Sequence, residues 1–335
     1  VSLIFAVSFL FLVTRGYFRN TVPEPAAGGV FVDGLIGQPA LVNPVIAATD
    51  ADRDIAELIF ANLPDLLEKQ EVSDDQKTWS FTVKENLVWS DGEPITSDDF
   101  IFTLELIKDA DTRSPLFAGW QGVIGERLSE RQFRFSLKTP YAFFADNLKS
   151  FKPIPRHIFE NIPPINIRLS EYNLEPIASG PFVYESFEKR KDGFISKYIL
   201  VRNKKYAGTK PLLDGFRFEF FANKDGLISA FNQREVLGFG GLEFKDLENL
   251  LVDHHLYKIS IPSYYAVFLN QALNAQLKDK NIRQALGLGV DKQKIVSEVF
   301  DNHAMVIHGP ITPGVAGYEP SIYKDERFDP DTASA

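Results

Sequence analysis

Alternating apolar and polar positions indicate where the chain forms strands. Trp79, Phe81 and Val83 alternate with polar residues, as expected for a half-buried strand. The same pattern, or a short apolar run, predicts further strands at 30–35, 133–137, 198–201, 216–220 and 264–270.

Apolar residues that recur every three or four positions predict helices. In the first of these, Ile55, Leu58 and Ile59 fall on one face. Thr96 stands three residues before Asp99, which forms a capping box ahead of the second. The helices are predicted at 50–67, 97–107, 225–232, 281–288 and 292–300. Because strands and helices are mixed throughout, the class is α/β or α+β.

The N-terminal segment is apolar and is followed by a linker rich in Pro, Ala and Gly at 22–29. Residues 1–13 carry no charge, but a membrane span needs about 20 residues. The first residue is Val1 rather than Met, so we expect residues upstream. A signal-peptide core and an uncleaved signal anchor both fit, and the lack of an A-x-A cleavage site favours the anchor. By the positive-inside rule, Arg15 and Arg19 favour a cytoplasmic position for the chain that follows an anchor. Residues upstream of Val1 can outweigh them, so the orientation of the anchor in the membrane stays open.

Composition excludes several classes of function. The net charge is −9 and no run of Lys or Arg occurs, so nucleic-acid binding is not predicted. The chain has no Cys, which excludes disulfides, thiol catalysis, Cys-type zinc sites and lipidation through an N-terminal Cys. The His254-His255 pair indicates a surface loop rather than a metal site. We therefore predict no metal and no cofactor. The 29 Phe and 11 Tyr fill a core or line a ligand cleft.

Motifs for catalysis are missing from the sequence. It contains no GxSxG, P-loop or GxGxxG motif. The run Gly238-Phe239-Gly240-Gly241 lacks the Lys-Ser/Thr that binds phosphate, and is typical of a strand end that another backbone or a ligand approaches closely. The pairs Asp74-Asp75 and Asp98-Asp99 stand in a turn and at a helix start rather than in an acid/base site. We predict no catalytic residues and no enzyme.

A signature becomes specific between Thr78 and Phe100, where TWSFTV is followed from Leu87 by LVWSDGEPITSDDF. This closely resembles extracellular solute-binding protein family 5, the peptide, dipeptide and nickel receptors of ABC importers. Other segments match in the family's order: LVNP at 41–44, SGPF at 179–182, VRNKKY at 201–206, and FLN at 268–270 with Asp279, IRQAL at 282–286 and VDK at 290–292. The chain departs from the family pattern in three places. Ser179 stands where the family has Thr, Lys204 stands where it has Pro, and the stretch at 60–70 is shorter than the family norm. The signature itself is interpreted as structural, because its turn and helix cap need no ligand.

The resemblance covers about residues 30 to 330. It implies a mixed α+β fold of the type II periplasmic-binding-protein kind, with two lobes joined by a hinge and an extra subdomain on the first lobe. The family continues beyond the motif at 328–333, so we expect the second lobe to be truncated. The expected parts are signal anchor and linker 1–29, first lobe 30–60, inserted subdomain 61–170, first lobe again 171–263, and hinge with the start of the second lobe 264–335.

The resemblance also implies where a ligand binds, namely in a cleft between the lobes. The implied residues are Ala48, Thr49 and Asp50 at the cleft edge, Gly240, Gly241 and Leu242 on the first lobe, and Tyr264, Tyr265, Phe268 and Asn270 at the hinge. A peptide can add there as a strand. The tyrosines stack on or hydrogen bond to the ligand, or only pack the hinge.

The function that the resemblance implies is capture of peptides outside the cytoplasmic membrane for an ABC permease and its ATPase. The protein is expected to be a monomer in the periplasm or on the outer face of the cytoplasmic membrane, held through its N-terminal segment. The alternative is a membrane-anchored sensor or scaffold with the same fold and no role in import.

Overall fold

The computed structural model describes residues 7, 9, 11, 13–16, 21, 24–259, 263–313, 315, 317–322 and 328–334. The chain divides into two compact units. The first extends to Leu242 and includes Asn249–Leu251, and the second comprises Glu243–Glu248 and the residues from Val252 onward. The predicted domain boundaries remain a prediction.

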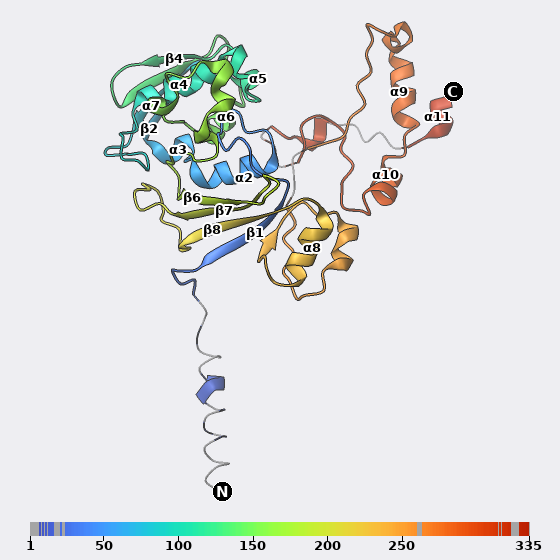
Figure 1. The fold of residues 1–335 in the computed structure, drawn as a ribbon. Helices are drawn as coiled ribbons and strands as arrows, with labels where there is room; N and C mark the ends of the chain where they lie inside the picture. The colour runs from blue at the N-terminus through green and yellow to red at the C-terminus, as the bar shows by residue number, and fades with distance from the viewer. Residues whose placement is uncertain are drawn as a thin grey trace. The chain divides into compact units, whose positions relative to one another are not determined.

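Two sheets organise the described part of the first unit (Figure 1). The larger sheet has the order β6(Phe182–Lys189), β7(Ile195–Arg202), β8(Gly215–Phe221), β1(Val30–Ile36), β9(Gly238–Phe239). The smaller sheet has the order β2(Leu67–Val72), β3(Thr78–Val83), β5(Gln132–Ser136), β4(Ile124–Arg127). The helices of this unit are α2(Asp50–Ile59), α3(Leu63–Leu66), α4(Ser97–Lys108), α5(Phe117–Trp120), α6(Phe144–Ser150), α7(Arg156–Phe159) and α8(Lys224–Asn232), with 3-10 turns η1(Ala110–Thr112), η2(Pro164–Leu169) and η3(Glu171–Asn173).

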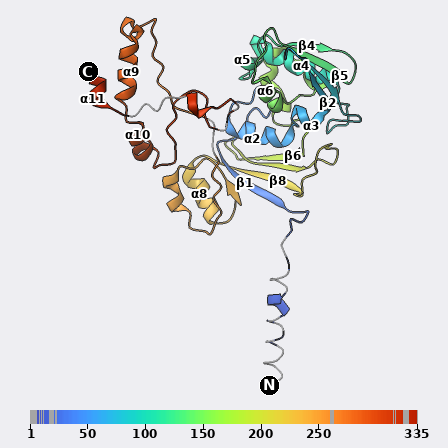
Figure 2. The ribbon, with the colours of Figure 1, turned by 180° about the vertical axis from the view of Figure 1, so that it is seen from behind.

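The larger sheet is covered on both faces, by α2 on one side and α8 on the other (Figures 1 and 2). Successive residues of β1 point to opposite faces of the sheet, and Val32 and Gly34 both face α8. A Cβ at Gly34 would overlap with Leu227 of α8, so the missing side chain lets this helix pack closely on the strand. β8, β1 and β9 are parallel, and they end at one edge of the sheet.

The smaller sheet packs its aromatic face against α4. Phe81 and Phe133 are cross-strand partners whose rings are 4.9 Å apart, and Phe100 of α4 stacks on Phe133 at 4.7 Å. All three rings are buried, which places a large part of the Phe content in a core. The predicted capping box also forms, because Thr96 and Asp99 each accept from the other's backbone N–H.

The end of α2 docks against the segment that precedes β6. The backbone N–H groups of Ser179 and Gly180 both donate to Ile59 O, at 3.1 and 2.6 Å. Ser179 Oγ in turn accepts from Ala61 N at 3.0 Å. These bonds satisfy a carbonyl at a helix end that otherwise lacks a partner. An ideal Cβ on Gly180 would lie 2.7 Å from Ile59 O, so only glycine fits there.

One helix prediction was wrong in its extent. The helix that begins at Asp50 ends at Ile59 rather than near Leu67. Phe60 is extended, the short helix α3 then begins with Pro64 in its first turn, and β2 starts at Leu67. Proline lacks the N–H that a continuous helix needs, and it disfavours a helical residue before it. The predictions for the turn at 74–77 and the strands at 30–35, 79–83, 133–137, 198–201 and 216–220 are confirmed within a residue or a few at each end.

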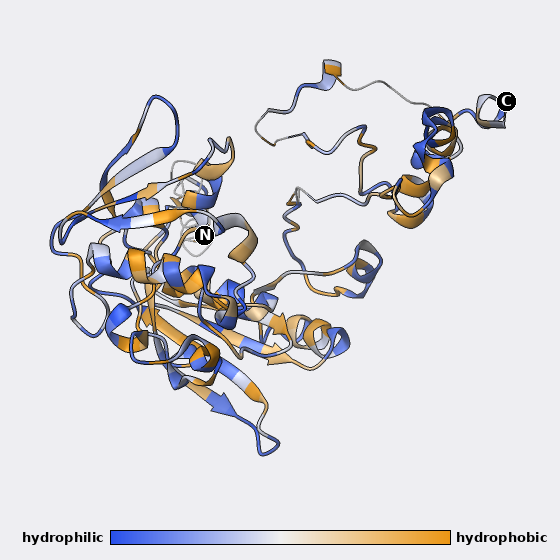
Figure 3. Cartoon of the chain, turned by 90° about the horizontal axis from the view of Figure 1, so that it is seen from above, coloured by the Kyte–Doolittle hydropathy of each residue, from blue (hydrophilic) through white to orange (hydrophobic). Residues whose placement is uncertain are grey.

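The second unit contains mostly short elements. They are η4(Phe244–Asn249), whose last residue belongs to the first unit, η5(Ala275–Lys278), α9(Lys280–Leu288), α10(Lys292–Val299), η6(Pro320–Ile322) and α11(Pro330–Ser334). α9 and α10 confirm two predicted helices, with Asp279 and Asp291 as N-caps. Both carry apolar as well as polar residues on their surfaces (Figure 3). Val296 is the buried apolar side chain among this unit's described residues.

A strand was predicted at 264–270, and this prediction was wrong. These residues form no strand in the described part of the chain. Val267 and Phe268 are 88% and 86% exposed. An apolar pattern of this kind becomes a strand only when another backbone supplies hydrogen bonds, and none of the described segments does so.

Much of the predicted N-terminal anchor and linker lies outside the described residues. This holds for 1–6, 8, 10, 12, 17–20 and 22–23, and therefore for Arg19. In the parts that the structure describes, no helix has the length and apolar character required to cross a membrane.

Candidate functional site

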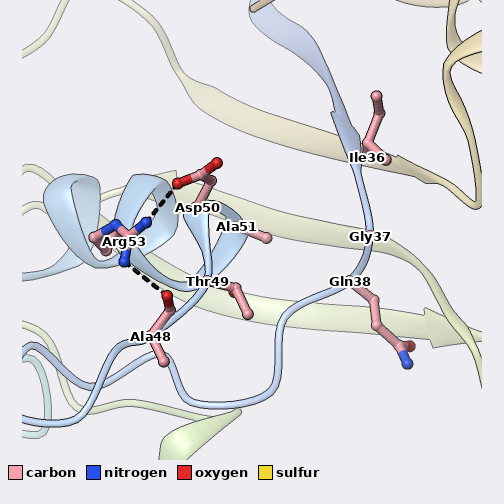
Figure 4. A pocket seen from close by; sticks show the side chains of 8 residues that line it. All are labelled: Ile36, Gly37, Gln38, Ala48, Thr49, Asp50, Ala51 and Arg53. Atoms are coloured by element: carbon pink, nitrogen blue, oxygen red, sulfur yellow. Dashed lines mark hydrogen bonds and ion pairs between the residues drawn. The ribbon is translucent and has the colours of Figure 1, made fainter. Parts of the chain in front are cut away.

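A cavity of about 370 Å³ opens at the carboxyl end of β1, between the loop that follows this strand and the start of α2 (Figure 4). It brings together Ala48, Thr49 and Asp50, the three residues implied for the cleft edge. Its other lining residues, which the sequence did not indicate, are Ile36, Gly37, Gln38, Ala51 and Arg53. In sheets with parallel strands, ligands bind outside the carboxyl ends of the strands, which is where this cavity lies.

One buried carboxylate fixes both walls of the cavity. Asp52 Oδ1 accepts from the backbone N–H groups of Ala40 and Leu41, each at 2.7 Å. Its Oδ2 accepts from the hydroxyl and the backbone N–H of Thr49, at 2.7 and 3.3 Å. Thr49 Oγ1 accepts from Asp52 N at 3.1 Å, which completes a capping box at the start of α2. The loop after β1 and the helix start are therefore held by the same side chain.

The charged residues of the rim neutralise each other. Arg53 Nη2 lies 2.5 Å from Asp50 Oδ1, and its Nη1 donates to Ala48 O at 2.7 Å (Figure 4). Both side chains are largely exposed, so the ion pair contributes little to stability. Its effect is to hold the Ala48 carbonyl and the first turn of α2 in one arrangement.

The opposite wall is the loop of Gly37 and Gln38, which crosses the end of β8 to reach β7. Gly37 has φ +95°, a conformation that suits glycine, and its N–H donates to Phe221 O at 2.9 Å. Gln38 Oε1 accepts from Ile195 N, the first residue of β7, at 2.7 Å. This wall is therefore tied to two strands of the sheet.

A carboxyl group with a perturbed pKa lies on β1, on the face toward α2. Burial, followed by the charge of Asp54, raises the pKa of Asp33 to about 6. The pKa of Asp54 is also raised, by burial and by the neighbouring Asp50. Asp33 does not line the cavity, and the effect belongs to the packing of α2 on the sheet.

The glycine-rich run ends a strand, as the sequence indicated. β9 stops at Phe239, and its pairing of Asp33 with Gly238 makes it parallel to β1, so Gly240 leaves the sheet at the same edge as the cavity. A Cβ at Gly240 or Gly241 would meet no atom within 4 Å. Gly240, Gly241 and Leu242 do not line the cavity in this structure.

The four implied hinge residues lie in the second unit. Tyr265 is 88% exposed, and its ring lies 5.5 Å from that of Phe300. Tyr264 is less exposed, and Phe268 is largely exposed. Asn270 caps a turn, because its Oδ1 accepts from Ala272 N at 2.9 Å. These four residues are not among those that line the cavity.

The signature turn has a structural role in the first unit. Gly92 has φ +109°, and its N–H donates to Trp89 O at 3.0 Å. Ser90 N donates to Ala178 O at 2.8 Å, and Ser90 Oγ accepts from Ala178 N at 2.9 Å. These contacts join the turn to the segment before β6, and none of them faces the cavity.

The carboxylates near this turn are also structural. Asp99 is buried and accepts from Thr96 N and Arg156 N, at 2.8 and 2.9 Å. Burial raises the pKa of Asp99, against these hydrogen bonds. Asp98 pairs with Arg127 at 2.9 Å. These arrangements fasten α4 in place.

A metal site has no candidate in the described residues, where no group of three or more His, Cys, Asp or Glu side chains is arranged to hold an ion.

A second cavity of about 450 Å³ lies beside α8. Asn232 closes it by donating to Asn249 O and accepting from Leu251 N, each at 2.8 Å. These bonds hold the backbone at Asn249 and Leu251 against α8, which is a structural role.

Comparison with known proteins gives a consistent result. A family model described as bacterial extracellular solute-binding proteins, family 5 Middle, matches residues 63–335. The oligopeptide-binding protein AppA of Bacillus subtilis is 27% identical over 311 residues, which cover 88% of this chain and 56% of that protein. Its structure in complex with a nonapeptide is similar with a TM-score of 0.71 at 25% identity, covering 92% of this chain and 63% of that chain. The ABC transporter substrate-binding protein CtaP of Listeria monocytogenes has a TM-score of 0.68 at 29% identity, covering 82% and 57%. The chain thus spans a little over half the length of these relatives.

Proposed function

The chain belongs to the bacterial extracellular solute-binding proteins of family 5, and on this basis we propose that it captures peptides for an ABC importer. The membership confirms the predicted resemblance and the mixed α+β fold. It also confirms that the chain is not an enzyme, because the family consists of binding proteins.

The observation that carries the peptide proposal is the cavity at the carboxyl end of β1. The residues that the resemblance implies for the cleft edge, Ala48 to Asp50, line it. Its volume of about 370 Å³ falls within the range of small-molecule sites, roughly 300–1,000 Å³, at the lower end. The relative AppA, solved with a nonapeptide, supports a peptide as the ligand class.

The remaining implied residues belong to the proposal as ligand contacts. Gly240 and Gly241 have open space where a side chain would be, so a ligand backbone can approach them closely. Leu242, Tyr264, Tyr265, Phe268 and Asn270 are proposed as further contacts, on the strength of the family resemblance. The predicted domain boundaries are proposed in the same way.

The setting of the protein is the last part of the proposal. The family's description as extracellular supports a place outside the cytoplasmic membrane. Delivery of the peptide to a permease with its ATPase, attachment through the N-terminal segment, and a monomeric state are proposed with it. These follow from the kind of protein that the relatives are named as.

The test is a binding measurement with defined ligands. Isothermal titration with synthetic peptides of two to nine residues and free termini should give saturable binding by the full chain. Tight binding of a nickel–histidine complex or a sugar, with no peptide bound, would refute the peptide proposal.

A variant locates the site. Ala48→Trp places a large side chain in the cavity, and we expect it to abolish or strongly weaken peptide binding. Ala142→Trp, at another exposed alanine, is the matched control and should bind as the unchanged chain does. Equal binding by both variants would place the site elsewhere.

A further inference from the structure

We propose that Gln38 is a ligand-contacting residue of this cavity, and that its side-chain NH₂ group donates a hydrogen bond to an oxygen of the bound peptide. The inference rests on the proposed function and specifies its chemistry. The residue was implied neither by the sequence nor by the family resemblance.

The hydrogen-bond partner of Gln38 determines which end of its side-chain amide is the oxygen and which is the nitrogen. Ile195 N carries a hydrogen and can only donate, so the side-chain atom that lies 2.7 Å from it must be the oxygen Oε1. The NH₂ group at Nε2 is therefore the end that remains, and it makes no hydrogen bond to any described residue. Ile195 is buried and Gln38 is exposed, so the bond joins a strand of the sheet to a side chain that a ligand can reach.

Each of the other polar side chains that line the cavity makes bonds within the protein, although Arg53 keeps further N–H groups. Thr49 Oγ1 donates to Asp52 and accepts from Asp52 N. Asp50 and Arg53 form an ion pair with each other. The rest of the lining is glycine, alanine and isoleucine. Gln38 is thus the uncharged lining side chain with a donor still available to a ligand.

Gln38 is also held in place before any ligand arrives. Its backbone follows Gly37, whose N–H is fixed to Phe221 O, and its side chain is fixed to Ile195. Because the backbone and the side-chain oxygen of Gln38 are both held, the side chain loses little conformational freedom when a ligand binds, which favours affinity. Because an NH₂ group can only donate, the ligand atom that it meets must be an acceptor oxygen, either a main-chain carbonyl or a terminal carboxylate.

Gln38→Glu is the direct test. The new carboxylate still accepts from Ile195 N but presents an oxygen in place of the NH₂ group. Gln70→Glu, at an exposed residue of β2, makes the same change in charge away from the cavity and is the control. The probe is the synthetic peptide of two to nine residues that binds the unchanged chain most tightly, titrated as the free acid and as the C-terminal amide.

We expect Gln38→Glu to weaken binding of the free acid at least tenfold, and Gln70→Glu to leave it unchanged. An equal loss for the amide assigns the main-chain carbonyl, and a loss confined to the free acid assigns the carboxylate. Peptide binding that Gln38→Glu leaves within twofold would overturn this inference and leave the proposed function intact. Failure of the unchanged chain to bind any peptide would instead refute the proposed function, and the inference with it.

A second readout separates contact from folding. The side-chain NH₂ signals of Gln38, identified by their loss in Gln38→Glu, should shift in a nitrogen–proton NMR spectrum when the peptide saturates the protein. The melting temperature of Gln38→Glu should match that of the unchanged chain, whereas Gln38→Leu should melt lower because Ile195 N loses its acceptor. Unmoved Gln38 signals at saturation would count against the contact.

Discussion

Replacement of Gly180 by alanine should destabilise the first unit strongly. An ideal Cβ there would lie 2.7 Å from both the carbonyl carbon and the oxygen of Ile59, and 2.9 Å from Leu58 O. These are backbone atoms at the end of α2, so no side chain can rotate away to make room. The helix end and the segment before β6 must move apart.

The magnitude follows from two contributions. Forcing a methyl group into a packed site costs about 1–3 kcal/mol. The bonds from Ser179 N and Gly180 N to Ile59 O weaken as the backbones separate, at roughly 0.5–1.5 kcal/mol each. Together these give a loss of about 2–6 kcal/mol in the free energy of unfolding. In a unit of this size each kcal/mol lowers the melting temperature by about 2–4 °C, so it should fall by roughly 4–24 °C.

The assay is urea unfolding followed by circular dichroism, with a thermal melt beside it. The urea midpoint should fall while the slope of the transition stays constant. Gly240→Ala is the stability control, because a Cβ there meets no atom within 4 Å. If Gly180→Ala unfolds within about 0.5 kcal/mol of the unchanged chain, the close approach of the two backbones is not rigid and the reasoning fails.

Three further predictions concern buried or constrained polar groups. Thr112 is fully buried and its hydroxyl has no partner among the described residues, so Thr112→Val should raise the free energy of unfolding by about 1 kcal/mol; a lower urea midpoint would contradict this. The pKa of Asp33 is raised to about 6 in the folded state from a usual 3.8, so its stabilising effect is present at low pH and is lost as pH rises through 6. Asp33→Asn should therefore match the unchanged chain near pH 4 and exceed its melting temperature near pH 7, and a constant difference across this range would refute the cause. Asp52→Ala removes a buried carboxylate that accepts from Ala40, Leu41 and Thr49, so unfolding should become easier by roughly 2–4 kcal/mol and peptide affinity should fall with it; unchanged affinity in the folded variant would show that the walls hold without Asp52.

Local patterns predicted the elements of the fold well where the deciding interactions are local. The capping box of Thr96 and Asp99 and the alternation around Phe81 depend on neighbours in the sequence or on one buried face. The end of α2 was missed because the apolar residues after Ile59 continue the helical pattern and outweighed the local signal of Pro64. The bond from Ser179 N to Ile59 O, which satisfies this helix end, comes from 120 residues later. The strand expected at 264–270 failed because a strand needs a partner that no local pattern reveals.

The candidate site was predicted in part, and only through the family resemblance. It pointed to Ala48, Thr49 and Asp50, which line the cavity. Gln38 had no signal in the sequence, because its role depends on Ile195, 157 residues away. Arg53 was missed for a different reason, since a helix of ordinary charge pattern does not show which of its residues face a cavity.

Asp52 supports the cavity but does not line it. It holds the loop at Ala40 and Leu41 and the start of α2 from behind, in a buried position that no ligand reaches. Ala48 and Asp50 stand exposed in front of it. Under the proposed function, substitutions at these front positions should therefore alter which ligand is preferred, while the frame behind them keeps its shape.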